Sequence, residues 1–151
     1  RTPGRRVVLL AGAAALTGLA ATALSQSWLE FLRGNWGANA GVVALTALAV
    51  SSVVAGLTAL GRTAGLACGA VLMVLVGNAT SGASTAPELL PRAVAWTGRL
   101  LPPGAGSHAL RGTAFFDGNG IGRDLAVLVV WSLLGLAMVA WGARRAAARA
   151  A

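Results

Sequence analysis

The sequence contains no lysine and no tyrosine, one cysteine, one histidine and only four acidic residues against twelve arginines. Of its 151 residues 11% are charged and 56% are hydrophobic, with a mean hydropathy of +0.74. Ordinary soluble domains carry about 25% charged residues. The scarcity of charge therefore predicts a chain that is embedded in a membrane, with the lipid bilayer as its first partner.

Few residues are available for metal, disulfide or nucleic-acid chemistry. Cys68 is alone, so neither a disulfide nor a CxxC metal site can form, and we expect it to be a small buried residue of an apolar run. The net charge of +8 is dispersed, and no basic face is interleaved with aromatic residues as nucleic-acid binding would require. We expect no cofactor, no metal and no nucleic-acid partner.

Long apolar runs dominate what is present. Four of them reach the roughly 17–25 residues that cross a bilayer, at about 7–25, 38–60, 64–80 and 125–142. The first also resembles a signal peptide, but no small-residue cleavage site opens a soluble domain after it. Residues 1–151 are therefore predicted to form one all-α, polytopic transmembrane domain, which we expect to be part of a longer protein.

Arginine placement predicts the orientation of these spans. One side collects seven arginines and no acid, namely Arg1, Arg5, Arg6, Arg62, Arg144, Arg145 and Arg149. All four acids fall on the opposite side, and the positive-inside rule then puts both ends in the cytoplasm. Trp28, Trp36 and Trp141 flank the spans as interfacial anchors, whereas Trp131 lies deeper and either packs between helices or faces lipid.

The spans themselves contain no ionisable side chain. Such groups are costly in a bilayer and usually functional, so their absence argues against an ion-coupled pump. The third span carries a glycine ridge at four-residue spacing, which predicts close helix packing at Gly61, Gly65 and Gly69.

An outer hairpin, residues 81–123, separates the third and fourth spans. Thr85 and Glu88 form a capping box at the start of a first short helix. Pro91 either kinks that helix or opens a new one, and 102–104 ends the first helical segment. Ser107 is expected to cap a second short helix. Both segments are too short to span, so we expect re-entrant or interfacial helices. They indicate the outer mouth of a transport pathway, with a candidate gate formed by Asn78, Glu88, Pro91, Pro102, Pro103 and Arg111.

The sequence gives little support for an enzyme. His108 has no acidic or cysteine neighbour along the chain and is expected at the surface. The glycine-rich segment 118–122 follows no strand, so a phosphate loop is excluded by context, and no GxxxxGK[ST] motif is present. We expect no catalytic site.

The order of features resembles the C-terminal half of an ABC-2-type permease membrane domain, of the YhgE/Pip-like kind. The resemblance covers about 61–142 and is weaker before it. The residues that carry it are Gly61-Arg62 through Gly77-Asn78, Ser81-Gly82, Pro87-Glu88-Leu89-Leu90-Pro91, Leu101-Pro102-Pro103-Gly104, Arg111, Phe116-Asp117-Gly118 and Trp131.

This resemblance implies a multi-pass domain of the bacterial plasma membrane that pairs with a second permease half. It implies alternating access driven by a separate ABC ATPase subunit, with the outer hairpin capping the exit. The uncharged spans would suit an amphipathic or lipid-like substrate. The rival expectation is a non-transporting envelope protein, an anchor or phage-receptor-like scaffold for an extracellular domain.

Overall fold

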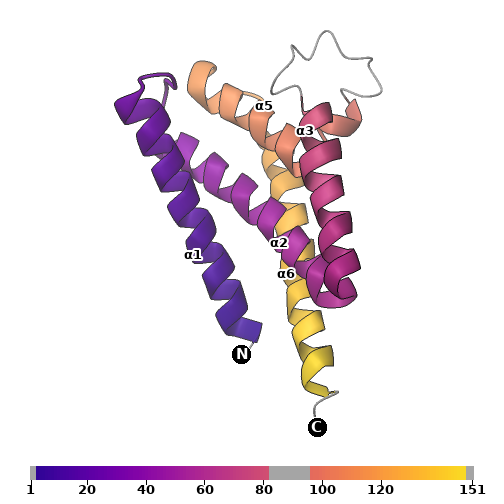
Figure 1. Cartoon of the computed structure of the whole chain (residues 1–151). Coiled ribbons are helices and arrows are strands. Elements are labelled where there is room, and N and C mark those ends of the chain that lie inside the picture. Colours follow the sequence, from indigo (N-terminus) through magenta and orange to yellow (C-terminus); the bar gives the residue numbers. More distant parts are fainter. Residues whose placement is uncertain (1–2, 82–95, 149–151) are drawn as a thin grey trace.

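The computed structural model describes residues 3–81 and 96–148, and every regular element in this part of the chain is a helix (Figure 1). The elements are α1 (Pro3–Thr22), η1 (Ala23–Trp28), α2 (Trp36–Ala70), η2 (Val71–Val76), α3 (Gly77–Thr80), α5 (Pro102–Phe115) and α6 (Gly122–Ala148), where η marks a π-helix. Three continuous helical stretches are long and apolar enough to cross a membrane: Gly4–Trp28, Trp36–Ala79 and Gly122–Ala148. The all-α class expected from the sequence is thus confirmed, with three apolar helices of membrane length where four runs were predicted.

The longest stretch folds back on itself at Arg62. This residue has φ 52° and ψ −126°, which is not a helical conformation and is uncommon for any residue other than glycine. Beyond Arg62 the chain reverses and runs through η2 and α3 back toward the end where it began (Figure 1). α2 therefore has two arms, 36–61 and 63–70, and the second continues into η2 and α3.

Local sequence explains where two helices begin. Asn35 caps α2, because it is extended and its Oδ1 accepts a hydrogen bond of 2.9 Å from the Ala38 amide. α5 begins with Pro102 and Pro103 after the extended Leu101. Proline suits the first turn of a helix, since its missing N–H has no partner there anyway. The prediction that 102–104 ends one helix and Ser107 caps the next was wrong: 102–104 opens α5, and Ser107 lies inside it.

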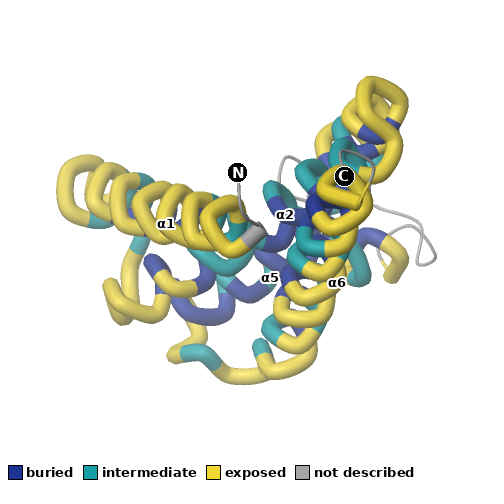
Figure 2. Tube along the Cα trace, turned by 90° about the horizontal axis from the view of Figure 1, so that it is seen from below, coloured by how far each residue is buried: buried dark blue, intermediate teal, exposed yellow. Residues whose placement is uncertain are grey.

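The core lies where α2, α5 and α6 meet. Ala49, Ala105 and Leu128 are fully buried there, with Leu45, Val127 and Trp131 packed around them. Figure 2 shows the buried residues gathered on α2, α5 and the inward face of α6, while α1 is largely exposed. Trp131 packs between helices, and its indole N–H donates to the Leu100 carbonyl over 2.8 Å.

Small residues let α2 approach its neighbours closely. A Cβ added to Gly18 of α1 would lie 2.6 Å from the Cβ of Ala44, and one added to Gly56 would lie 2.7 Å from the Cβ of Met138 in α6. Within lipid, where helices have no hydrophobic drive to associate, such close van der Waals contacts help to hold them together. The α1–α2 and α2–α6 crossings are therefore set by glycine.

The outward faces are apolar, as lipid contact requires. Val8 is 70% exposed and Leu133 62% exposed, although both belong to helices long enough to cross a bilayer. Cys68 is also exposed, which corrects the expectation that it is buried. It lies on the outward face of the second arm of α2 and takes no part in the core.

Candidate functional site around helix α5

Helix α5 crosses one end of the helix set, opposite the end where the chain termini lie (Figure 1). It contacts α2, α3 and α6. Eight of its residues are buried, and all of them are small or compact: Pro102, Gly104, Ala105, Gly106, Ala109, Gly112, Thr113 and Ala114. α5 is consequently seated close against three other elements.

A buried polar cluster joins α5 to α2. The Asn39 side chain is completely buried, and its Nδ2 donates to Gln26 Oε1 at 2.9 Å and to the Arg33 carbonyl at 2.8 Å. Its Oδ1 accepts a 2.6 Å hydrogen bond from the Thr113 hydroxyl of α5. Asn39 thereby links η1, the 29–35 loop, α2 and α5 through satisfied hydrogen bonds, as burial of an amide demands.

The loop before α2 rests directly on α5. Gly34 has φ +83°, and a Cβ at this position would overlap the Thr113 carbonyl oxygen. The Gln26 amide donates to the Gly34 carbonyl over 2.8 Å. Glycine is needed at Gly34 for both reasons, the backbone angle and the close approach.

A second polar contact joins α5 to α6. His108 Nδ1 lies 2.7 Å from Asp124 Oδ2, and the Asp124 residue is only 4% exposed. Arg99 Nη2 contacts the other ring nitrogen, Nε2. Because a guanidinium can only donate, Nε2 must accept, and Nδ1–H then donates to the carboxylate. The imidazole of His108 thus lies between the guanidinium of Arg99 and the carboxylate of Asp124.

Sequence reasoning missed both polar contacts. His108 was expected at the surface without a partner, but its partner comes from the first turn of the next helix. Asn39 lies just inside an apolar run and was not singled out. The one available signal was its position as a large polar amide in a segment predicted to span the membrane.

The predicted gate residues are partly brought together. Pro103 faces α3, since a Cβ added to Gly77 would lie 2.7 Å from Pro103 Cγ. Pro102 is buried at the start of α5, Arg111 is half-buried on α5, and Asn78 is exposed on α3. The Asn78 carbonyl accepts from the Ser81 hydroxyl at 2.8 Å. Glu88 and Pro91 lie outside the described residues.

The glycine ridge divides at the reversal of α2. A Cβ on Gly65 would overlap the Leu57 carbonyl, and one on Gly69 would lie 3.2 Å from the Cα of Val54. Both glycines therefore pack the second arm of α2 against the first. Gly61 is exposed and has open space around it, so it takes no part in this crossing.

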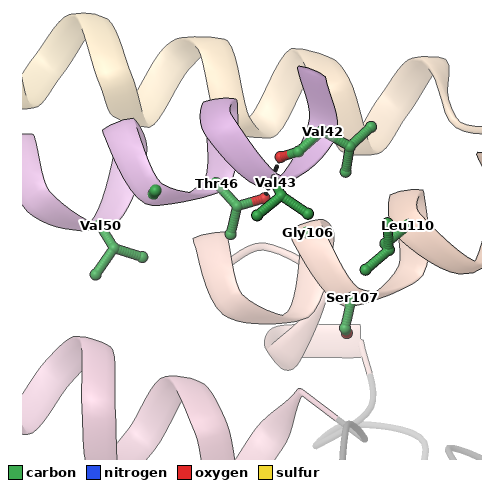
Figure 3. A pocket seen from close by; sticks show the side chains of 8 residues that line it. Val42, Val43, Thr46, Val50, Gly106, Ser107 and Leu110 are labelled. Atoms are coloured by element: carbon green, nitrogen blue, oxygen red, sulfur yellow. Dashed lines mark hydrogen bonds between the residues drawn. The ribbon is translucent and has the colours of Figure 1, made fainter. Parts of the chain in front are cut away.

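A groove lies between α2 and α5 (Figure 3). It has a volume of about 380 Å³ and is lined by Val42, Val43, Thr46, Ala47, Val50, Gly106, Ser107 and Leu110. Five of these residues come from the first arm of α2 and three from α5. Six carry no polar side-chain atom.

In comparisons with known proteins, no family model, no curated protein and no solved structure matches this chain.

Proposed function

We propose that these residues form the membrane-embedded permease domain of an ABC-2-type exporter that moves an amphipathic or lipid-like substrate with the help of a separate ATPase subunit. The observation that supports this proposal best is the short helix α5, held across one end of the apolar helices and tied to α2 and α6 by buried polar contacts. A helix that does not span but covers the ends of spanning helices is suited to closing a pathway. The apolar groove beneath it suits a substrate with an apolar part.

The proposal includes four crossings of the bilayer. At 1.5 Å per residue the arm 36–61 is about 39 Å long and the arm 63–80 about 27 Å, against a hydrocarbon core of about 30 Å. A single straight helix over the same residues would measure about 66 Å, twice what a bilayer covers. With the reversal at Arg62, each arm matches one crossing.

The positions of the arginines support a cytoplasmic location for both ends of the chain. Arg5, Arg6, Arg144 and Arg145 are all exposed and lie near the two termini, which share one end of the molecule (Figure 1). Arg62 lies at the turn that points toward the same end. By the positive-inside rule this end faces the cytoplasm, and α5 then lies on the outer side.

In this mechanism α5 acts as the outer cap. Opening the exit requires α5 to move relative to α2 or α6, so the Thr113–Asn39 and His108–Asp124 contacts set the stability of the closed state. The driving energy comes from the ATPase subunit acting on parts of the protein at the cytoplasmic end. A second permease half completes the pathway.

Thr113→Val tests this function directly. The substitution keeps the shape of the side chain but removes the hydroxyl that donates to Asn39, and leaves the buried Asn39 Oδ1 without that partner. We expect a severalfold change in ATP-dependent export of a fluorescent NBD-phospholipid from proteoliposomes that contain the full-length protein and its ATPase. Thr17→Val is the matched control, because the Thr17 hydroxyl donates only within its own helix, to the Ala13 carbonyl.

The control should export like the wild type, with both variants reconstituted at equal amounts. If the wild type moves no probe in an ATP-dependent way, the permease proposal fails and a non-transporting envelope scaffold becomes the better description. If the wild type exports but Thr113→Val is unchanged, α5 does not cap the pathway.

A further inference from the structure

The size of the groove between α2 and α5 and the residues that line it determine which kind of ligand it can bind. Its α2 wall consists of Val42, Val43, Thr46, Ala47 and Val50, and the distance from Val42 to Val50 is about 12 Å along the helix. Gly106, Ser107 and Leu110 of α5 form the opposite wall. Figure 3 shows the residues of α2 beside those of α5, and Gly106 lies directly against Thr46, so the groove is the open depression beside this contact.

The two hydroxyl groups of the groove already donate their protons to backbone carbonyls, so the groove offers a ligand no hydroxyl proton. The Thr46 hydroxyl donates to the Val42 carbonyl over 2.8 Å. The Ser107 hydroxyl lies 3.0 Å from the Gly104 carbonyl and 3.1 Å from the Ser81 carbonyl. An ordered water needs two to four polar partners, and the side chains of this groove offer only the lone pairs of two hydroxyls, so an apolar group is accommodated more favourably than a polar one.

The groove is too small to enclose a helix. The space between its atoms, about 700 Å³ with the open side included, gives a mean cross-section of at most roughly 60 Å² over a length of about 12 Å. An α-helix with side chains is about 10 Å across and needs roughly 80 Å². A hydrocarbon chain, whose atoms approach their neighbours at about 4 Å, fits within the available width.

The groove also lies at the depth where such chains occur. Val42 is six residues into α2, about 9 Å from the start of the helix, and Val50 is about 21 Å from it, well inside a span of membrane thickness. Val43, Ala47 and Val50 are only half-buried. A chain in the surrounding bilayer can therefore reach them.

We infer that this groove binds one acyl chain of a bilayer phospholipid, which enters it from the membrane. Only the consequence for transport rests on the proposed function. If the protein is an exporter, a phospholipid held by its chain under α5 makes phospholipid-like molecules the substrate class. Binding itself requires only the groove and the membrane.

Native mass spectrometry of the full-length protein tests the inference without ATP or transport. The delipidated protein is titrated with palmitoyl-oleoyl phosphatidylglycerol, and we expect one lipid per chain to be retained under activation that strips other lipids. Val50→Trp, which fills the groove, should lower this retention at least tenfold. Val130→Trp is the matched control, because Val130 is 53% exposed on α6 and away from the groove, and it should retain lipid like the wild type.

A second measurement needs no variant. A phospholipid with a diazirine in its chain is photolysed with the wild-type protein, and unlabelled lipid should compete away adducts on residues 42–50 but not those on Leu133. Equal retention by Val50→Trp and the wild type, or adducts on 42–50 that do not saturate, would overturn the groove assignment. So would a dimer that Val50→Trp dissociates, since a second copy would then occupy the groove. Retained phospholipid in a protein that exports nothing would count against the export proposal alone.

Discussion

Individual polar residues decide how α5 is held. The Asp124 carboxylate is almost completely buried and takes a hydrogen bond from His108, while Asn39 is completely buried and bonds three different segments. A buried polar group that loses its partner costs about 1–3 kcal/mol. Two side-chain contacts thus hold α5 at both its flanks, toward α2 and toward α6.

A double-mutant cycle measures the second of these contacts. We expect His108→Ala to lower the free energy of unfolding by about 1–3 kcal/mol, because it removes a partner of the buried Asp124 carboxylate. Combined with Asp124→Asn, it should show a coupling energy of at least about 0.5 kcal/mol. Unfolding by SDS in mixed micelles provides the measurement, with exposed Arg123→Ala as a control that leaves stability unchanged. Strict additivity would mean that the pair contributes nothing.

At the scale of elements, the two arms of α2 touch immediately after the chain reverses. Gly65 and Gly69 make this possible, because the backbone of the first arm occupies the space that a side chain would need. Close approach gives van der Waals contact between apolar helices, which have no hydrophobic drive to associate within lipid. The hairpin is therefore sensitive to side-chain size at these two glycines.

Gly65→Ala, with Gly61→Ala as its control, tests whether the hairpin is sensitive to side-chain size. The first should destabilise the protein by about 1–3 kcal/mol, since the added methyl group overlaps the Leu57 carbonyl and the arms must move apart. The second meets open space and should be neutral or raise stability by up to about 1 kcal/mol through helix propensity. Thermal unfolding in detergent compares the two. Equal melting temperatures would show that the arms do not pack as described.

Sequence patterns predicted the long helices but not the contacts between them. The apolar runs predicted the helical class and the long helices, because burial in lipid needs continuous hydrophobic residues. The start of α5 was predicted wrongly, since prolines both end helices and open them. Ser107 has the chemistry of a cap, but its hydroxyl lies near the Gly104 carbonyl of its own helix and the Ser81 carbonyl after α3. The pairing of His108 with Asp124 depends on how α5 lies against α6, which no local pattern encodes. The π-helical turns of η1 and η2 also have no sequence signature in these apolar segments.

For the whole molecule, the proposed four crossings predict which surfaces reagents can reach. In a Cys68→Ala background, Phe31→Cys and Phe116→Cys should react with a membrane-impermeant thiol reagent in intact cells, because both positions are exposed at the α5 end. Ala148→Cys should react only after the cells are opened. The removal of Cys68 is necessary because that thiol is itself exposed. Reaction at position 148 in intact cells would reverse the orientation, and reaction at only one of the two loop positions would change the number of crossings.

The reversal at Arg62 also bears on how the protein is made. No hydrophilic loop separates the two arms of α2, so during synthesis the insertion machinery meets one apolar stretch whose single arginine, Arg62, lies near its middle. Neither arm can be released into the lipid while the other waits in water, because the link between them is too short to reach across the membrane. If this stretch crosses the bilayer twice as proposed, the two arms enter it together as a hairpin, and the one positive charge at its tip, retained in the cytoplasm, favours two crossings over one.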